Sequence, residues 1–186
     1  CPMSPRLRPG FKILIALWRT LRGVWNKVRT EPGLRFMATA VTFYGMSTFE
    51  GPLLSIKSVN AIAHYTDWIP GHVHSGTIGW NYMLVSGILF FLVPKLWKSE
   101  LFSKKLAHTQ FWLATIGLVF YIVSMWVAGI TQSLMWREMD DAGKLVYPNF
   151  VETVIKIVPM YWVRAIGGVL VLSSFILMIY NLYKTI

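Results

Sequence analysis

The sequence has little charge, few acidic residues and almost no cysteine. Only 14% of its 186 residues are charged, whereas about 25% is typical of soluble domains. Hydrophobic residues make up 55%, and the mean hydropathy is +0.51. A single cysteine, Cys1, excludes an internal disulfide and leaves no cysteine cluster for zinc or iron–sulfur chemistry. The composition therefore excludes an ordinary soluble domain and favours a membrane protein.

The chain begins with Cys1 and not with Met. A terminal cysteine can carry a lipid, but a lipidated N-terminus would have to face outward. We therefore expect Cys1 to be the edge of a longer product. We find no cleavable signal peptide, because the first apolar stretch, residues 11–18, is short and surrounded by positive charge.

Four apolar runs are long enough to cross a bilayer, which takes about 20 helical residues for roughly 30 Å of hydrocarbon. Charge, Trp or Tyr flanks each run, as expected at membrane interfaces. The sequence therefore predicts an all-α integral membrane protein with four transmembrane helices. The predicted spans cover residues 34–56, 71–97, 108–134 and 158–183.

The chain carries a net charge of +10, from 18 basic and 8 acidic residues. Such a charge can indicate nucleic-acid binding, but here the basic residues form no single face and we expect no nucleic acid partner. Eight of them lie in residues 1–35, and Lys95, Lys98, Lys104 and Lys105 surround the second turn. The positive-inside rule predicts that both termini and the 98–107 turn are cytoplasmic, with connections 57–70 and 135–157 outside.

Residues 11–29 combine apolar residues at helical spacing with basic ones. This pattern suits either a helix on the cytoplasmic surface of the bilayer or the tail of a truncated helix. Glu31-Pro32-Gly33 ends this segment and begins the first span. We divide the chain into a basic amphipathic cytoplasmic segment, 1–33, and a transmembrane part, 34–186. Residues 137–156 are predicted to form a structured loop.

Ionisable side chains inside membrane spans are costly and are functional candidates by default. The candidates are Glu50, His72, His74 and Arg164. Because a helix turns about 100° per residue, positions two apart point in nearly opposite directions. His72 and His74 therefore cannot chelate one metal ion, but they can serve two sites on opposite faces.

A neutral imidazole is a good axial ligand for haem iron. We expect the small residues around the pair to leave room for flat macrocycles; they are Gly71, Ser75, Gly76 and Gly79. The alternative is that one histidine packs in the protein and the other contacts water at the membrane interface.

Glu50 lies near the outer end of the first span, at the membrane depth of His72. A hydrogen bond from a ligating imidazole to this carboxylate would make the imidazole a stronger donor to iron. The alternative is a solvated or protonated carboxylate at a helix end.

Several long runs in residues 20–186 closely resemble the catalytic subunit of cbb3-type cytochrome c oxidases, a branch of the haem-copper oxidases. They include Thr42-Phe43-Tyr44-Gly45-Met46-Ser47-Thr48-Phe49-Glu50-Gly51-Pro52, His64-Tyr65-Thr66-Asp67-Trp68, Gly71-His72-Val73-His74-Ser75-Gly76 and Ser124-Met125-Trp126-Val127-Ala128-Gly129-Ile130-Thr131-Gln132. The resemblance implies that the four spans are the last four of the family's twelve-helix subunit. Residues 1–15 do not share it.

The resemblance also assigns roles to residues. His72 would be the proximal ligand of the high-spin haem, and His74 an axial ligand of the low-spin haem. Glu50 matches the family glutamate that hydrogen-bonds the proximal histidine. His64 and Asp67 fall where the outer loop approaches the haem propionates. Arg137 and Arg164 could also meet propionates, although ordinary charge pairing explains them equally well.

The family's other low-spin haem ligand and its three copper-binding histidines lie on earlier helices. This chain has four histidines, and His108 lies at the cytoplasmic edge of the third span, so no copper site can be assembled from it. The resemblance implies two b-type haems here and copper only in the complete subunit. The implied partners are the remaining helices, membrane-anchored cytochrome c subunits, the lipid bilayer and oxygen.

The implied function is part of a terminal oxidase of a bacterial inner membrane. Such an enzyme passes electrons from cytochrome c through the low-spin haem to a haem-copper centre, where oxygen is reduced to water with proton pumping. The alternatives are a nitric oxide reductase-like subunit, which shares the H-x-H helix, and a non-catalytic subunit or truncated remnant.

Overall fold

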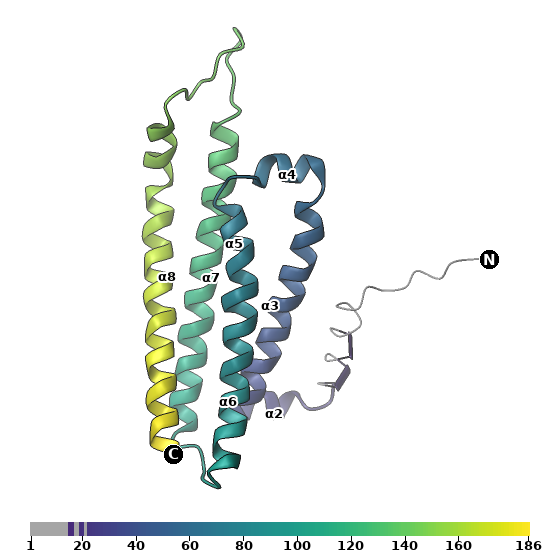
Figure 1. Ribbon diagram of the computed structural model, residues 1–186, viewed down its shortest axis with the longest axis vertical. Helices are drawn as coiled ribbons and strands as arrows, with labels where there is room; N and C mark the ends of the chain where they lie inside the picture. Colours follow the sequence, from purple (N-terminus) through teal and green to yellow (C-terminus); the bar gives the residue numbers. More distant parts are fainter. Residues whose placement is uncertain (1–14, 17–18, 21) are drawn as a thin grey trace, which may run out of the picture.

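The computed structural model describes residues 15–16, 19–20 and 22–186, and long helices dominate it (Figure 1). No β-strand occurs in these residues apart from an isolated bridge between Met139 and Leu145. The predicted all-α fold class is confirmed. The helices are α2 (Trp25–Thr30), α3 (Pro32–Leu54), α4 (Lys57–Ala63), α5 (Trp68–His74), a π-helix η1 (Ser75–Tyr82), α6 (Met83–Leu96), α7 (Lys104–Met135) and α8 (Phe150–Thr185).

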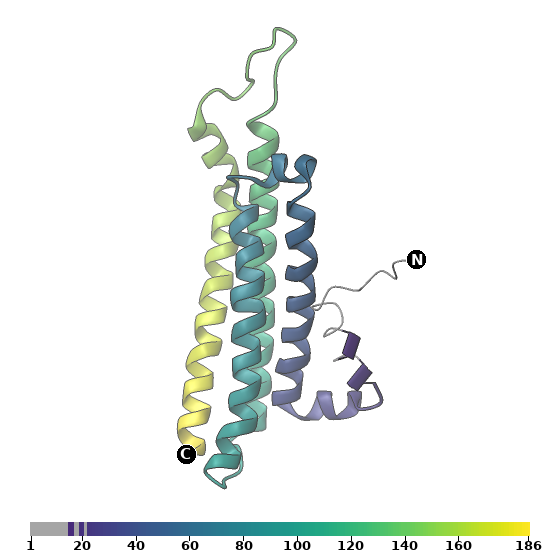
Figure 2. The ribbon, with the colours of Figure 1, turned by 45° about the vertical axis from the view of Figure 1, so that its right-hand side comes forward.

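Three helical stretches in the described part of the chain are long and apolar enough to cross a membrane: Trp68–Leu96, Lys104–Met135 and Phe150–Thr185. The first is continuous through α5, η1 and α6. The remaining predicted span, α3, has 23 residues, about 35 Å of helix. It is less apolar because Gly, Ser, Thr and Glu50 interrupt its hydrophobic run. It nevertheless packs alongside η1 and α6, and both views show it running beside them along the bundle, tilted in Figure 1 (Figures 1 and 2).

The ends of the helices follow local sequence signals. Glu31 is extended and Pro32 begins α3, as predicted from the Glu-Pro-Gly run. The Ser103 hydroxyl accepts a hydrogen bond from the backbone of Leu106 at the start of α7. The Asn149 side chain accepts one from Val151 at the start of α8. α8 therefore begins at Phe150, several residues before the predicted span.

The connection between α7 and α8 is ordered by its own hydrogen bonds. The Asp140 carboxylate accepts from the backbone of Ala142 and Lys144, and Gly143 has a positive φ of 72°. This loop lies at the same end of the bundle as α4, whereas the C-terminus and the 97–103 loop lie at the other end (Figure 1). The sequence predicts this grouping, in which connections 57–70 and 135–157 share one end of the bundle and the turn between the second and third spans lies at the other. Residues 11–14, 17–18 and 21 of the predicted 11–29 helix lie outside the described residues. In the described part, residues 15–16 and 19–20 are helical and residues 25–29 belong to α2.

Glycines bring the helices close together. A Cβ on Gly117 would meet the backbone oxygen of Gly167, so α7 and α8 touch at this point. A Cβ on Gly87 would likewise meet the backbone oxygen of Gly33, between α6 and α3. Close approach of backbones at small residues is the usual way in which membrane helices pack, because lipid leaves no hydrophobic driving force between them.

Candidate functional site

His72 lies at the meeting point of α5 and α3. Its Nδ1 is 3.1 Å from Oε2 of Glu50, which is the partner that the sequence predicts for that carboxylate. The indole nitrogen of Trp68 donates a hydrogen bond of 2.7 Å to the other carboxylate oxygen. Glu50 is 6% exposed, so these two bonds replace the water that burial removes.

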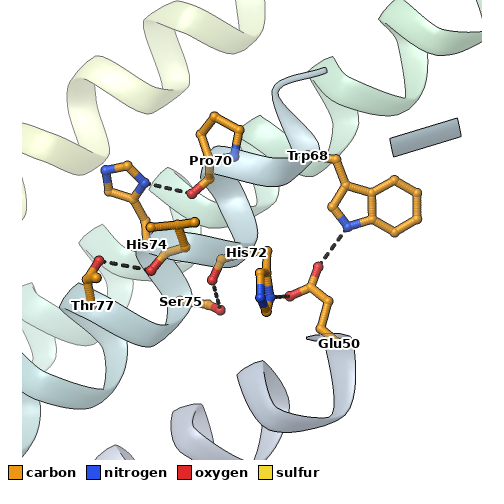
Figure 3. Close-up of polar contacts among 8 residues, drawn as sticks. Glu50, Trp68, Pro70, His72, His74, Ser75 and Thr77 are labelled. Atoms are coloured by element: carbon orange, nitrogen blue, oxygen red, sulfur yellow. Dashed lines mark hydrogen bonds and ion pairs between the residues drawn. The ribbon is translucent and has the colours of Figure 1, made fainter. Parts of the chain in front are cut away.

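His74 is held by its own helix and projects from the other side of it. Its Nδ1 is 2.6 Å from the backbone oxygen of Pro70, one turn earlier. A backbone carbonyl can only accept, so Nδ1 carries the proton and donates. The imidazole ring packs near Tyr121 of α7, with centroids 5.2 Å apart. Figure 3 shows the two imidazoles on opposite sides of α5, with His72 directed toward Glu50.

The tautomers of both histidines follow from these partners. Both rings present Nδ1–H to an acceptor, a carboxylate for His72 and a carbonyl for His74. In a neutral imidazole the other nitrogen, Nε2, then carries the free lone pair. Metal-ligating histidines show this arrangement, in which an acceptor fixes the ring and the opposite nitrogen binds the metal. The chain therefore presents two separate nitrogen donors, one on each face of α5.

The glycines near the histidines do not leave the open space that we predict from the sequence. A Cβ on Gly71 would meet the Trp126 ring, one on Gly79 the Phe43 ring, and one on Gly76 the Ser47 hydroxyl. Ser75 is fully buried and bonds the His72 carbonyl. These residues serve helix packing. The expectation of clearance for a macrocycle at these glycines is wrong, because α3 and α7 fill the space.

The two loop residues of the predicted site are in different environments. The Asp67 backbone nitrogen donates to Gln132 at 2.7 Å, and the Gln132 amide returns a bond of 3.3 Å to the carboxylate. Arg164 of α8 lies 4.0 Å from Asp67. Asp67 thus joins α5 to α7 and α8. His64 is exposed and its ring packs on Tyr65, so the structure does not bring it into contact with His72 or His74.

Trp68, Gln132 and Tyr121 contact the predicted site residues. The sequence assigns no role to any of them, although Trp68 and Gln132 lie within the runs that carry the resemblance. Gln132 and Asp67 are 65 positions apart, so no local spacing links them. A buried carboxylate needs more than one hydrogen-bond donor. This requirement could have indicated that a nearby indole bonds Glu50.

Replacing Trp68 with Phe is expected to destabilise the protein by about 1–3 kcal/mol, because a buried carboxylate loses a donor. Thermal unfolding of the purified membrane complex measures the effect. Trp112→Phe is the matched control, because Trp112 is 55% exposed. An equal loss of stability in both variants would show that the effect comes from the smaller apolar area of the ring and not from the hydrogen bond to Glu50.

The donor set fits haem, because a ligating histidine supplies one axial nitrogen to a haem iron. Both imidazoles are only partly buried, so each ring keeps an open side. In residues 15–16, 19–20 and 22–186, no three His, Cys, Asp or Glu side chains form a cluster that could hold a metal ion.

Comparisons with known proteins agree with the resemblance seen in the sequence. The family model described as "Cytochrome C and Quinol oxidase polypeptide I" matches residues 9–170. Cytochrome c oxidase subunit 1 of Rhodobacter capsulatus is 55% identical over 168 residues, which are 90% of this chain and 31% of that protein. A subunit 1 homolog of Agrobacterium tumefaciens (strain T37) is 54% identical with the same coverage.

The cbb3-type cytochrome c oxidase subunit CcoN1 of Stutzerimonas stutzeri is 49% identical over 181 residues, which are 97% of this chain and 38% of that protein. The chain thus spans about a third of the length of the curated relatives it matches. Together with the helical membrane fold, the family match over most of the chain establishes that it belongs to the cytochrome c and quinol oxidase polypeptide I family.

Proposed function

We propose that this chain is part of a terminal oxidase of the cbb3 type and supplies ligands to two different haem irons, through Nε2 of His72 and Nε2 of His74. One observation carries the proposal: a pure acceptor holds Nδ1 of each ring, and the two rings lie on opposite faces of one helix. When bound, the haems, with the copper of the complete subunit, supply electron transfer from cytochrome c to oxygen, coupled to proton pumping.

The residues of this chain hold and tune those ligands. Glu50 orients the His72 ring and increases the electron density on its free nitrogen, because a carboxylate pulls the Nδ1 proton toward itself. Trp68 fixes the carboxylate in turn. His74 has a neutral carbonyl as its acceptor, so its ring is the weaker donor of the two. The proposed sites therefore differ electronically, although one helix supplies both.

Glu50→Gln is expected to raise the midpoint potential of the high-spin haem. The neutral amide accepts the Nδ1 proton less strongly, and a weaker imidazole donor stabilises ferric iron less. Spectroelectrochemical titration of the assembled complex measures this potential. Glu100→Gln, an exposed site at the other end of the bundle, is the control. An unchanged potential in a complex that retains the haem would remove Glu50 from its proposed role.

The proposal also includes the parts of the enzyme that this chain does not supply. The copper ligands and the second low-spin ligand come from the other helices of the catalytic subunit, so we expect the chain to be inactive alone. Membrane-anchored cytochrome c subunits donate electrons, and Asp67 and His64 face the haem propionates. The complex resides in a bacterial inner membrane, with both termini and the 97–103 loop in the cytoplasm, as the distribution of Lys and Arg favours.

Turnover tests the choice of substrate. The assembled membrane complex that contains this chain is expected to consume oxygen with reduced cytochrome c, and to do so faster than it consumes nitric oxide. The Phe49-Glu50-Gly51-Pro52 run, whose glutamate contacts His72, favours oxygen. Faster turnover of nitric oxide would support the reductase alternative, and turnover of neither would support a non-catalytic subunit or a remnant.

A further inference from the structure

A polar cluster lies between η1, α6, α7 and α8, away from the two histidines. Hydrogen bonds join Tyr82, Gln110 and Ser174, and helical spacing places Ser86 one turn from Tyr82; we call these four residues the Tyr82 cluster. The hydroxyl of Tyr82 is 2.8 Å from that of Ser174 and 3.4 Å from the amide nitrogen of Gln110. Ser86 follows Tyr82 by four residues, so both side chains leave the same face of the helix.

The hydrogen bonds of this cluster run in one direction. The Ser174 hydroxyl donates its single proton to the backbone oxygen of Val171, at 2.7 Å. It can therefore only accept from Tyr82, and Tyr82 in turn accepts from Gln110. The chain of donors begins at the Gln110 amide, whose oxygen has no donor of its own.

Two atoms of the cluster have no partner among the described residues: Oε1 of Gln110 and the hydroxyl oxygen of Ser86. Both residues are 0% exposed. Exchanging the amide oxygen and nitrogen of Gln110 does not help, because the atom turned away from Tyr82 then lacks a partner instead. An unpaired buried polar atom is strongly unfavourable, and natural proteins rarely retain one.

Another helix cannot supply the missing partners. The chain itself already encloses Gln110 and Ser86 completely, so a neighbouring subunit has no access to them. Polar residues nearer the 97–103 loop differ, because Asn181 bonds both the nitrogen and the oxygen of Ser103. Buried Ala107 and Met178 separate that paired group from the Tyr82 cluster along α7 and α8.

We propose that the Tyr82 cluster binds internal water. A water molecule that donates to Oε1 of Gln110 and hydrogen-bonds the Ser86 hydroxyl completes both groups. Buried waters in proteins typically make two to four such bonds, and they occupy polar sites whereas apolar cavities stay dry. Gln110 and Ser86 are both fully buried, so the water is enclosed within the protein. The proposal is independent of the haem assignments.

A high-resolution electron cryo-microscopy map of the assembled complex tests the proposal directly. We expect ordered density within hydrogen-bonding distance of Gln110 Oε1 and the Ser86 hydroxyl. We expect this density to disappear in the Ser86→Ala, Gln110→Leu double variant. An empty site, or a protein group that bonds both atoms, would overturn the proposal.

Thermal unfolding of the same complex gives a second readout. Ser86→Ala is expected to lower Tm by about 2 °C or more, because a bound water loses a partner. Ser173→Ala, which removes a hydroxyl bonded only within its own helix, is the matched control and is expected to leave Tm nearly unchanged. If Ser86→Ala raised Tm or left it unchanged, the hydroxyl would have no water partner and the proposal would fail.

Discussion

An assembled complex carrying His72→Ala is expected to lose carbon monoxide binding and oxygen reduction. Alanine removes the imidazole nitrogen proposed to bind iron beside Glu50, and the carboxylate, which is 6% exposed, loses its imidazole partner. The proposed high-spin iron would then have no axial nitrogen from α5. A carbon monoxide difference spectrum measures the first effect, and oxygen consumption measures the second.

The control for this prediction is His108→Ala. His108 lies in the first turns of α7, at the end of the bundle away from α4, and should leave carbon monoxide binding intact. A complex with His72→Ala that assembles normally and still binds carbon monoxide would exclude His72 as the proximal ligand. Comparing the amounts of assembled complex separates loss of a ligand from failure to fold.

Gly129→Ala is expected to destabilise the complex by about 1–3 kcal/mol or more, although alanine normally favours a helix. A Cβ at this position would collide with the backbone nitrogen of Trp68, at the first residue of α5. Backbone cannot move aside as a flexible side chain can. The start of α5 would be pushed from α7, and the Trp68 bond to Glu50 would be lost with it. Thermal unfolding and the spectrum of the same sample measure both effects.

Gly168→Ala provides a matched comparison on α8. Its Cβ would lie 3.7 Å from the Tyr121 ring, which is ordinary contact, so the change should be neutral or slightly stabilising. Equal Tm values for the two variants would contradict the close packing of α5 on α7, and with it the account of how the histidine helix is positioned.

Much of the fold can be predicted from the sequence because the bilayer imposes a simple rule. A span needs about 20 apolar residues with every backbone group paired, so hydropathy reveals the helices. Glu31-Pro32 marked the start of α3, and the two-residue spacing of His72 and His74 placed them on opposite faces. The Glu50 contact could also be predicted, because both groups lie at one depth on adjacent spans.

Other features depend on contacts between distant segments. The bond between Asp67 and Gln132 joins positions 65 apart, and no periodicity reveals it. In the sequence, Gly71 and Gly79 suggest open space for a haem macrocycle. In the structure, Trp126 and Phe43 fill the space beside them. Hydropathy also misses the first turns of α8, because Glu152, Thr153 and Lys156 interrupt their apolar residues; these turns begin at a cap formed by Asn149.

The most direct test of the central claim is to compare two single variants, His72→Ala and His74→Ala, by reduced-minus-oxidised spectra with and without carbon monoxide. One helix with two donors on opposite faces predicts that each variant loses a different signal. His74→Ala should lose the low-spin b-type band, and His72→Ala the high-spin signal that reacts with carbon monoxide. If both assembled variants lost the same signal, or kept both, the proposal that the two histidines bind two irons would be contradicted.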